Sequence, residues 1–198
     1  IGGIIISGGP RSVTEAGSPR VHPSILSMGV PILGICYGHQ LLAATMPGGV
    51  VKPSYSREYG LAKLKLRADL KVGTTAVGTT IELFEGVPDG SQVWVSHGDS
   101  VEKLPDGFEV LGATEDCAVA AMVHPAKHIY GVQFHPEVTH SEFGQRILEN
   151  FVRRVCRSDS SWRPSSAETI DAIKDDIRAN VGETKNVLFF VSGGVDSS

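Results

Sequence analysis

Residues 30–38 read VPILGICYG, an apolar run that leads directly into a Gly-x-Cys-x-Gly turn. This is the pattern of a nucleophile elbow, in which a buried strand passes through a sharp turn into a helix, here with cysteine at the tip. Gly34 and Gly38 are expected on either side of Cys36 because larger side chains would clash within a strained turn. The next residues are good helix formers, so the thiol would lie at a helix N-terminus, where the dipole favours the reactive thiolate. A buried core cysteine in an ordinary strand–helix unit is the alternative.

A second stretch, residues 131–137 (GVQFHPE), offers a base and an acid. Its alternating pattern predicts a strand, and residues two apart on a strand point to the same face. His135 and Glu137 are therefore expected side by side, with Pro136 stiffening the backbone between them. A carboxylate beside an imidazole fixes its tautomer and stabilises the imidazolium, as in a nucleophile–base–acid triad. An ordinary hydrogen-bonded histidine is the alternative for His135.

A nucleophile that attacks a carbonyl carbon also needs hydrogen-bond donors for the developing oxyanion. Elbow enzymes use the backbone N–H of the residue after the nucleophile, which is Tyr37 here, and a second N–H from another loop. Residues 7–10 (SGGP), which follow the apolar run Ile4–Ile6, are a candidate for that loop. The same turn also fits a phosphate loop or a plain strand–helix connection.

Four motifs in this order, SGGPRSV, GICYGHQ, SHGDSV and QFHPEV, resemble a class I glutamine amidotransferase domain. The chain as a whole resembles the glutamine-hydrolysing GMP synthetase family. Tyr37 stands where relatives in tryptophan, folate and pyrimidine synthesis usually carry leucine. The chain also ends in VLFFVSGGVDSS, which is similar to the phosphate loop of ATP pyrophosphatases, where glycine N–H groups approach a pyrophosphate. The resemblance implies ATP-binding residues Ser192, Gly193, Gly194, Val195, Asp196, Ser197 and Ser198.

The resemblance also implies the parts of a glutaminase site. Cys36, His135 and Glu137 would be catalytic, and the N–H groups of Gly9 and Tyr37 would hold the oxyanion. The implied glutamine-binding residues are Gln40, Ser96, Gly98 and Asp99. Residues 56–60 (SREYG) are also similar to the family, and we expect a charged surface loop or a domain contact there.

The implied reaction is glutamine-dependent synthesis of GMP. The glutaminase needs no cofactor and no metal site, and its ammonia would pass to xanthosine monophosphate that Mg-ATP has activated. The small-molecule partners would be glutamine, xanthosine monophosphate and ATP, and the full-length protein is expected to be a homodimer. Two alternatives stay open: a cysteine hydrolase of γ-glutamyl or peptide bonds without ammonia transfer, and a non-catalytic regulatory module.

The expected fold class is α/β, a flavodoxin-like amidotransferase with a mixed central sheet flanked by helices. The expected domains are residues 1–157, an N-terminally truncated glutaminase, residues 158–166, a linker, and residues 167–198, a C-terminally truncated start of an ATP pyrophosphatase domain. The first two strands, Ile4–Ile6 and Pro31–Ile35, lack polar alternation, as in parallel strands covered on both faces. Further strands are expected at 62–67, 79–83, 92–96, 110–113, 118–123, 129–134 and 187–191, and helices at 23–28, 141–157 and 168–181.

Composition sets the broad class. The chain has 198 residues, 41% hydrophobic and 20% charged, as is usual for a soluble globular protein. Its net charge of −4 argues against a general nucleic-acid binder. No apolar run approaches the roughly 20 residues that cross a bilayer, so no membrane partner is expected. The three cysteines, Cys36, Cys117 and Cys156, suggest neither a disulfide nor a metal framework, and favour a reducing cytoplasm.

Overall fold

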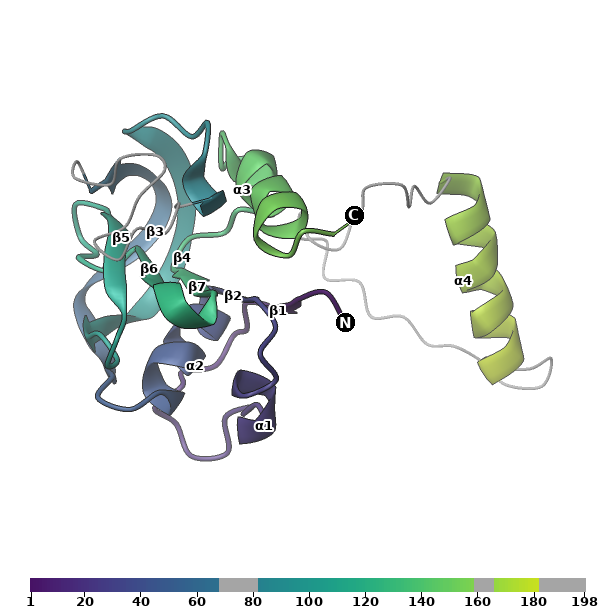
Figure 1. The fold of residues 1–198 in the computed structure, drawn as a ribbon, viewed down its shortest axis with the longest axis horizontal. Coiled ribbons are helices and arrows are strands. Elements are labelled where there is room, and N and C mark those ends of the chain that lie inside the picture. Colours follow the sequence, from purple (N-terminus) through teal and green to yellow (C-terminus); the bar gives the residue numbers. More distant parts are fainter. Residues whose placement is uncertain (68–81, 159–165, 182–198) are drawn as a thin grey trace. The chain divides into compact units, whose positions relative to one another are not determined.

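The computed structural model describes residues 1–67, 82–158 and 166–181 (Figure 1). The chain divides into two compact units, residues 1–158 and residues 159–198. The first contains the sheet and the predicted glutaminase residues. In the second, the structure describes a helix, α4 (Ser166–Val181), at the place of the predicted helix 168–181. The predicted strand 187–191 and the predicted phosphate loop 192–198 lie outside the described residues.

The described part of the first unit is built on a seven-stranded sheet with the order β1-β2-β7-β6-β5-β3-β4. Three of its strands are parallel: β1 (Ile4–Ile6), β2 (Ile32–Ile35) and β7 (Ile129–Val132). The others pair antiparallel: β6 (Ala121–His124), β5 (Glu109–Ala113), β3 (Val50–Leu66) and β4 (Ser91–Lys103). The predicted mixed sheet is therefore confirmed.

The register of the parallel strands determines where the site forms. Ile6 lies opposite Gly34, and Gly34 lies opposite Gly131 in the next strand. The C-terminal ends of β1, β2 and β7 therefore lie side by side along one end of the strands. The residues that follow these strands meet there, at the carboxyl ends where open α/β sheets bind ligands.

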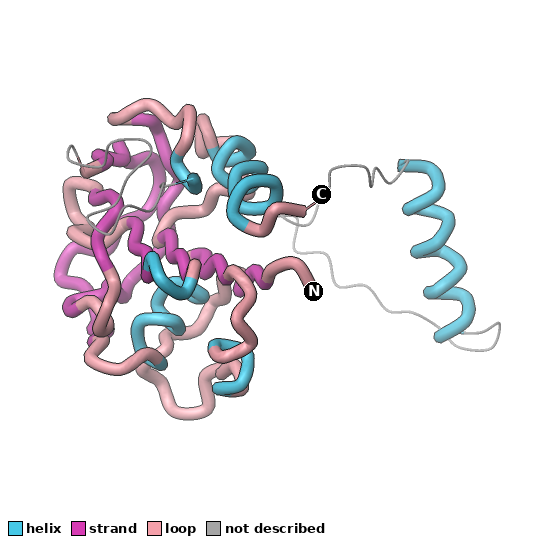
Figure 2. The backbone as a smooth tube through the Cα atoms, in the orientation of Figure 1, coloured by secondary structure: helices cyan, strands magenta, loops and turns pink. Residues whose placement is uncertain are grey.

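Helices cover both faces of the sheet. α1 (Pro23–Leu26) and α2 (Tyr37–Thr45) lie on one side and α3 (Gly144–Asn150) on the other, with the magenta strands of Figure 2 between them. α3 continues as a π-helical turn, Phe151–Val155. Alternate residues of β2 belong to different cores, because Ile32 packs with Leu42 of α2 whereas Leu33 packs with Ile147 of α3. Burial on both faces explains the unbroken apolar run in this strand.

One predicted strand is wrong where the structure describes it. Residues Glu82–Phe84 form a 3₁₀ helix, whereas residues 79–83 were expected in a strand, and 79–81 lie outside the described residues. Leu83 and Phe84 are both buried, so the short helical turn places consecutive apolar side chains in the core. An apolar pair of this kind resembles a strand in the sequence. A second 3₁₀ helix, Pro125–Lys127, separates β6 from β7.

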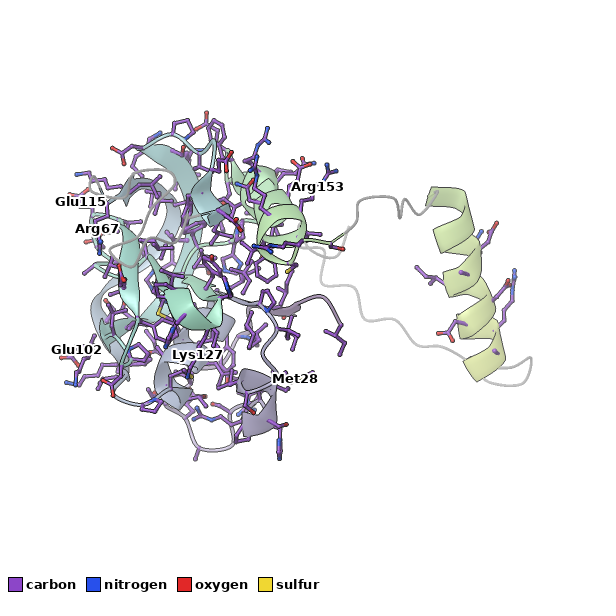
Figure 3. The ribbon with its side chains drawn as sticks, viewed as in Figure 1. Met28, Arg67, Glu102, Glu115, Lys127 and Arg153 are labelled. Carbon is purple, nitrogen blue, oxygen red and sulfur yellow. The ribbon has the colours of Figure 1, made fainter. Side chains whose placement is uncertain are left out.

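Charged side chains of both signs lie on the outer surface of the first unit. Glu102, Glu115, Lys127 and Arg153 are exposed, and Figure 3 labels all four, with Glu102, Glu115 and Arg153 near the outline of the unit. Within the described ranges, no helix combines the length and the apolar character needed to span a membrane.

Candidate active site

Cys36 lies at the tip of a strained turn between β2 and α2. Its backbone angles are φ 49° and ψ −103°, a left-handed φ that non-glycine residues rarely adopt. The Cys36 N–H donates to the Val132 carbonyl at 2.8 Å, which ties the turn to β7. The residue is only 6% exposed, and α2 begins at the next residue. The predicted elbow geometry is therefore confirmed.

Both glycines that flank Cys36 are sterically required. A Cβ on Gly34 would lie 2.6 Å from the Gly38 carbonyl, and a Cβ on Gly38 would lie 2.0 Å from the Ile6 carbonyl oxygen. These neighbours are backbone atoms, so they could move only if the strand or helix moved with them. The elbow can form only because the sequence has glycine at both positions.

Gly38→Ala is expected to lower the free energy of unfolding by about 3 kcal/mol or more, because the methyl group would force α2 away from β1. Thermal and urea unfolding measure the change. Gly2→Ala is the matched control, since a Cβ there meets nothing within 4 Å. Equal stability of the two variants would contradict the close packing of α2 on β1.

His135 and Glu137 are paired, as expected, but not on a strand. β7 ends at Val132, and both residues lie in the turns that follow it. His135 Nδ1 lies 2.6 Å from Glu137 Oε1, and the His135 N–H donates to the Trp94 carbonyl at 2.9 Å. The predicted proximity of the two side chains is confirmed. The expected strand is present as β7, but it ends at Val132 and does not reach them. The turn places the two side chains on the same side, and β4 anchors the backbone.

The electrostatics favour an imidazolium at His135. Its hydrogen bond with Cys36 and, next, its hydrogen bond with Glu137 raise the pKa of His135 to about 10, against the opposing effect of burial. Burial acts to raise the pKa of Glu137, but the hydrogen bond from His135 holds that pKa below its ordinary value. A proton on His135 is thus stabilised from both sides, by the sulfur and by the carboxylate.

A cavity of about 600 Å³ lies above the elbow and collects most of the predicted site residues. Its wall includes Cys36, His135, Gly9, Gln40, Ser96, Gly98 and Asp99. Glu137 contacts the Nδ1 atom of His135. Tyr37 follows Cys36 as the first residue of α2. The Tyr37 hydroxyl donates to the Pro19 carbonyl at 2.6 Å, which fixes its ring beside the SGGP loop. A Cβ on Gly8 would lie 3.1 Å from the His135 ring, so this loop passes close to the base.

Gln40 is held in place by bonds within the protein. Its Nε2 donates to the Asp99 carbonyl at 2.9 Å and to Gln133 Oε1 at 3.1 Å. Gln133 Nε2 in turn approaches Cys36 Sγ at 3.8 Å. Because both N–H groups of Gln40 have protein acceptors, its carbonyl oxygen is the group it can offer a ligand. Our sequence reasoning missed Gln133, although it lies two residues before His135 in the QFHPE motif.

Glu58 corrects the expectation of a charged surface loop at residues 56–60. It lies in β3, is only 6% exposed, and its Oε2 lies 3.0 Å from His97 Nε2. Its Oε1 accepts a hydrogen bond of 2.7 Å from the Thr114 hydroxyl. The neighbouring Tyr59 is 66% exposed, because alternate residues of a strand face opposite ways.

Potential metal-ligating atoms of Glu58, His97 and Cys117 lie within 4.8 Å of one another in this buried region. The carboxylate oxygens of Glu58 already have hydrogen-bond partners, and burial raises the pKa of the Cys117 thiol to about 11. The Glu58 carboxylate and the His97 ring thus already take part in a hydrogen-bonded network within the protein.

Comparison with known sequences places this arrangement in a family. The family described as "Glutamine amidotransferase class-I" matches residues 1–155. The chain is 48% identical over 196 residues to the GMP synthase [glutamine-hydrolyzing] of Caldicellulosiruptor saccharolyticus, and 46% identical to the Aspergillus oryzae protein of the same name. In both cases the match covers 99% of this chain and 35% of the relative. The chain thus spans about a third of the length of these curated relatives.

Solved structures agree on the fold. A Thermoplasma acidophilum protein assigned as one subunit of a GMP synthase matches with a TM-score of 0.61 and 26% identity, covering 88% of this chain and 77% of that one. A glutamine amidotransferase from Thermotoga maritima matches with a TM-score of 0.54 and 23% identity, over 89% of this chain and 64% of that chain. The second similarity concerns the fold alone.

Proposed function

The chain belongs to the class I glutamine amidotransferases, and on that premise we propose that the cavity at Cys36 binds glutamine and hydrolyses its side-chain amide to glutamate and ammonia. The observation that carries the proposal is the meeting of a strained Cys36 and the His135–Glu137 pair at one end of the parallel strands. A thiol, a base and an orienting carboxylate in this order are the parts of covalent acyl transfer.

In the proposed mechanism, the Cys36 sulfur attacks the amide carbon of glutamine. The N–H groups of Tyr37 and Gly9 stabilise the tetrahedral oxyanion, and His135 gives its proton to the leaving nitrogen, so that ammonia departs and a thioester remains. His135 then takes a proton from water, whose oxygen attacks the thioester, and glutamate leaves as the Cys36 thiolate reforms beside the His135 imidazolium. Glu137 keeps the imidazole oriented and stabilises its charge throughout.

The charges around the cavity suit a zwitterionic amino acid. Arg11 lines the wall together with two acidic residues, Glu15 and Asp99. A guanidinium pairs well with the α-carboxylate of a ligand, and carboxylates pair with its ammonium group. The Ser12 hydroxyl donates to Asp99 Oδ2, which holds that carboxylate at the cavity wall. We propose that Asp99, with Ser96, Gly98 and Gln40, binds the glutamine.

We extend the proposal to the longer protein by analogy with the relatives. Ammonia would displace AMP from xanthosine monophosphate that Mg-ATP has adenylated, which gives GMP and pyrophosphate. We propose residues 1–157 as the glutaminase domain, 158–166 as a linker, and 167–198 as the start of an ATP pyrophosphatase domain that binds ATP through residues 192–198. A homodimer in the cytoplasm, without nucleic-acid or membrane partners, completes the proposal.

The test is product analysis with glutamine as substrate. Equal amounts of glutamate and ammonia are expected from glutamine and neither product from asparagine, whose shorter side chain cannot place its amide at Cys36 while its α-groups reach Asp99. In the longer protein, xanthosine monophosphate with Mg-ATP is expected to convert the ammonia into GMP. Hydrolysis of γ-glutamyl peptides without ammonia release would instead favour a peptide hydrolase, and no release under any condition would overturn the proposal.

A further inference from the structure

We propose that Glu58 is a positioning residue for the glutamine pocket, which it holds in shape through a buried pair with His97. The inference rests on the proposed function and assigns the role to a residue of β3 that does not touch the substrate. Glu58 reaches residues 96–99 of strand β4, which form one wall of the cavity and loop out of the regular pairing with β3.

The backbone ladder between β3 and β4 is interrupted at this loop. Glu58 pairs with His97 and Pro53 pairs with Asp99, and the register shifts between these pairs. Gly98 alone on β4 therefore spans the interval that residues 54–57 occupy on β3. Because regular cross-strand bonding stops here, the conformation of the loop depends on side-chain hydrogen bonds.

A continuous chain of hydrogen bonds leads from Glu58 to the pocket. His97 Nε2 lies 3.0 Å from Glu58 Oε2, and His97 Nδ1 lies 3.0 Å from the Asp99 carbonyl oxygen. The same carbonyl oxygen accepts from Gln40 Nε2 at 2.9 Å. On the other side of the loop, Cys36 Sγ approaches the Ser96 carbonyl at 3.6 Å. A shift of His97 would therefore move the glutamine-binding wall at Asp99 and the Gln40 side chain that is bonded to it.

The protonation of His97 follows from its partners. A carbonyl oxygen can only accept, so Nδ1 carries a proton and donates it to Asp99. Nε2 is then the ring nitrogen that faces the Glu58 carboxyl, at 3.0 Å. His97 is 4% exposed and Glu58 6%, so truncating either side chain would leave a buried polar group without its partner.

Three substitutions of Glu58 separate positioning from simple packing. Glu58→Ala is expected to raise the KM for glutamine about tenfold or more, with a smaller loss in kcat, because the binding wall shifts. Glu58→Gln should rescue KM to within about twofold of wild type, since its amide can donate to His97 Nε2 and accept from Thr114. Glu58→Asp keeps the charge but shortens the reach, so it should fall between the two. Exposed Glu102, paired with Lys52 on the surface, gives the control Glu102→Gln.

Two readouts independent of turnover complete the test. Alkylation of Cys36 by iodoacetamide, followed by peptide mass mapping, should change less than about twofold in Glu58→Ala, because the reagent does not need the Asp99 wall. Nitrogen-15 NMR of the imidazoles should show a protonated Nδ1 at His97 in wild type and in Glu58→Gln. An unprotonated Nδ1, or an unchanged KM in folded Glu58→Ala and Glu58→Asp, overturns the proposal. If wild type does not hydrolyse glutamine, the proposed function fails, and the NMR result still decides how His97 is held.

Discussion

Replacing Cys36 with alanine is expected to lower the rate of glutamine hydrolysis by at least about 10⁴-fold, because the thioester of the proposed mechanism forms on the Cys36 sulfur. Cys36 is the nucleophile at the tip of the elbow, and the hydrogen bond between Cys36 and His135 makes the largest contribution to the raised pKa of His135. Removing the sulfur therefore removes both the attacking atom and much of the charge on its base. Ammonia and glutamate release under saturating glutamine measure the loss.

The same variant should still bind glutamine. Gln40 and Asp99 form their bond independently of the thiol, so glutamine is expected to raise the melting temperature of Cys36→Ala as it does that of wild type. Cys156→Ala is the matched control, since burial raises the pKa of this thiol and it lies outside the cavity at Cys36. A residual rate within tenfold of wild type in Cys36→Ala, or a thioester trapped on another residue, would contradict the role of Cys36.

The parts of the site that could be predicted from the sequence are those that depend on local geometry. The elbow requires glycine at 34 and 38 because the nearest atoms belong to the backbone of the same strand–turn–helix unit and of β1. His135 and Glu137 lie two residues apart, so almost any extended or turn conformation brings them close. The prediction of that pair was therefore correct even though the predicted strand ends at Val132.

The Glu58 network could not be predicted because its members come from separate strands and loops. Glu58 is 39 residues from His97 and 56 from Thr114 along the chain, and only the β3–β4 and β3–β5 pairings bring them together. A glutamate between arginine and tyrosine is expected on the surface, because ionised side chains are rarely buried without a partner. The partner that makes burial possible is not visible in the local sequence.

Changes at His135 and Glu137 should separate proton transfer from orientation. His135→Asn is expected to lower kcat about 10³- to 10⁴-fold, because His135 is the group that protonates the leaving ammonia in the proposed mechanism. Glu137→Gln should cost less in rate but change the pH profile. The Glu137 carboxylate raises the pKa of His135 through its hydrogen bond and its charge, so a neutral amide, which is a weaker acceptor, lowers that pKa from about 10.

The sign of the pH effect follows from the acid form of His135. The imidazolium is the proton donor, and it is lost as the pH rises through the pKa of His135. The alkaline limb of kcat/KM is therefore expected near pH 10 in wild type and at lower pH in Glu137→Gln, while Glu115→Gln, an exposed change, should leave the profile as it is. An alkaline limb at the same pH in Glu137→Gln and wild type would mean that Glu137 does not set the pKa of His135. Another group would then be the partner that stabilises the His135 imidazolium.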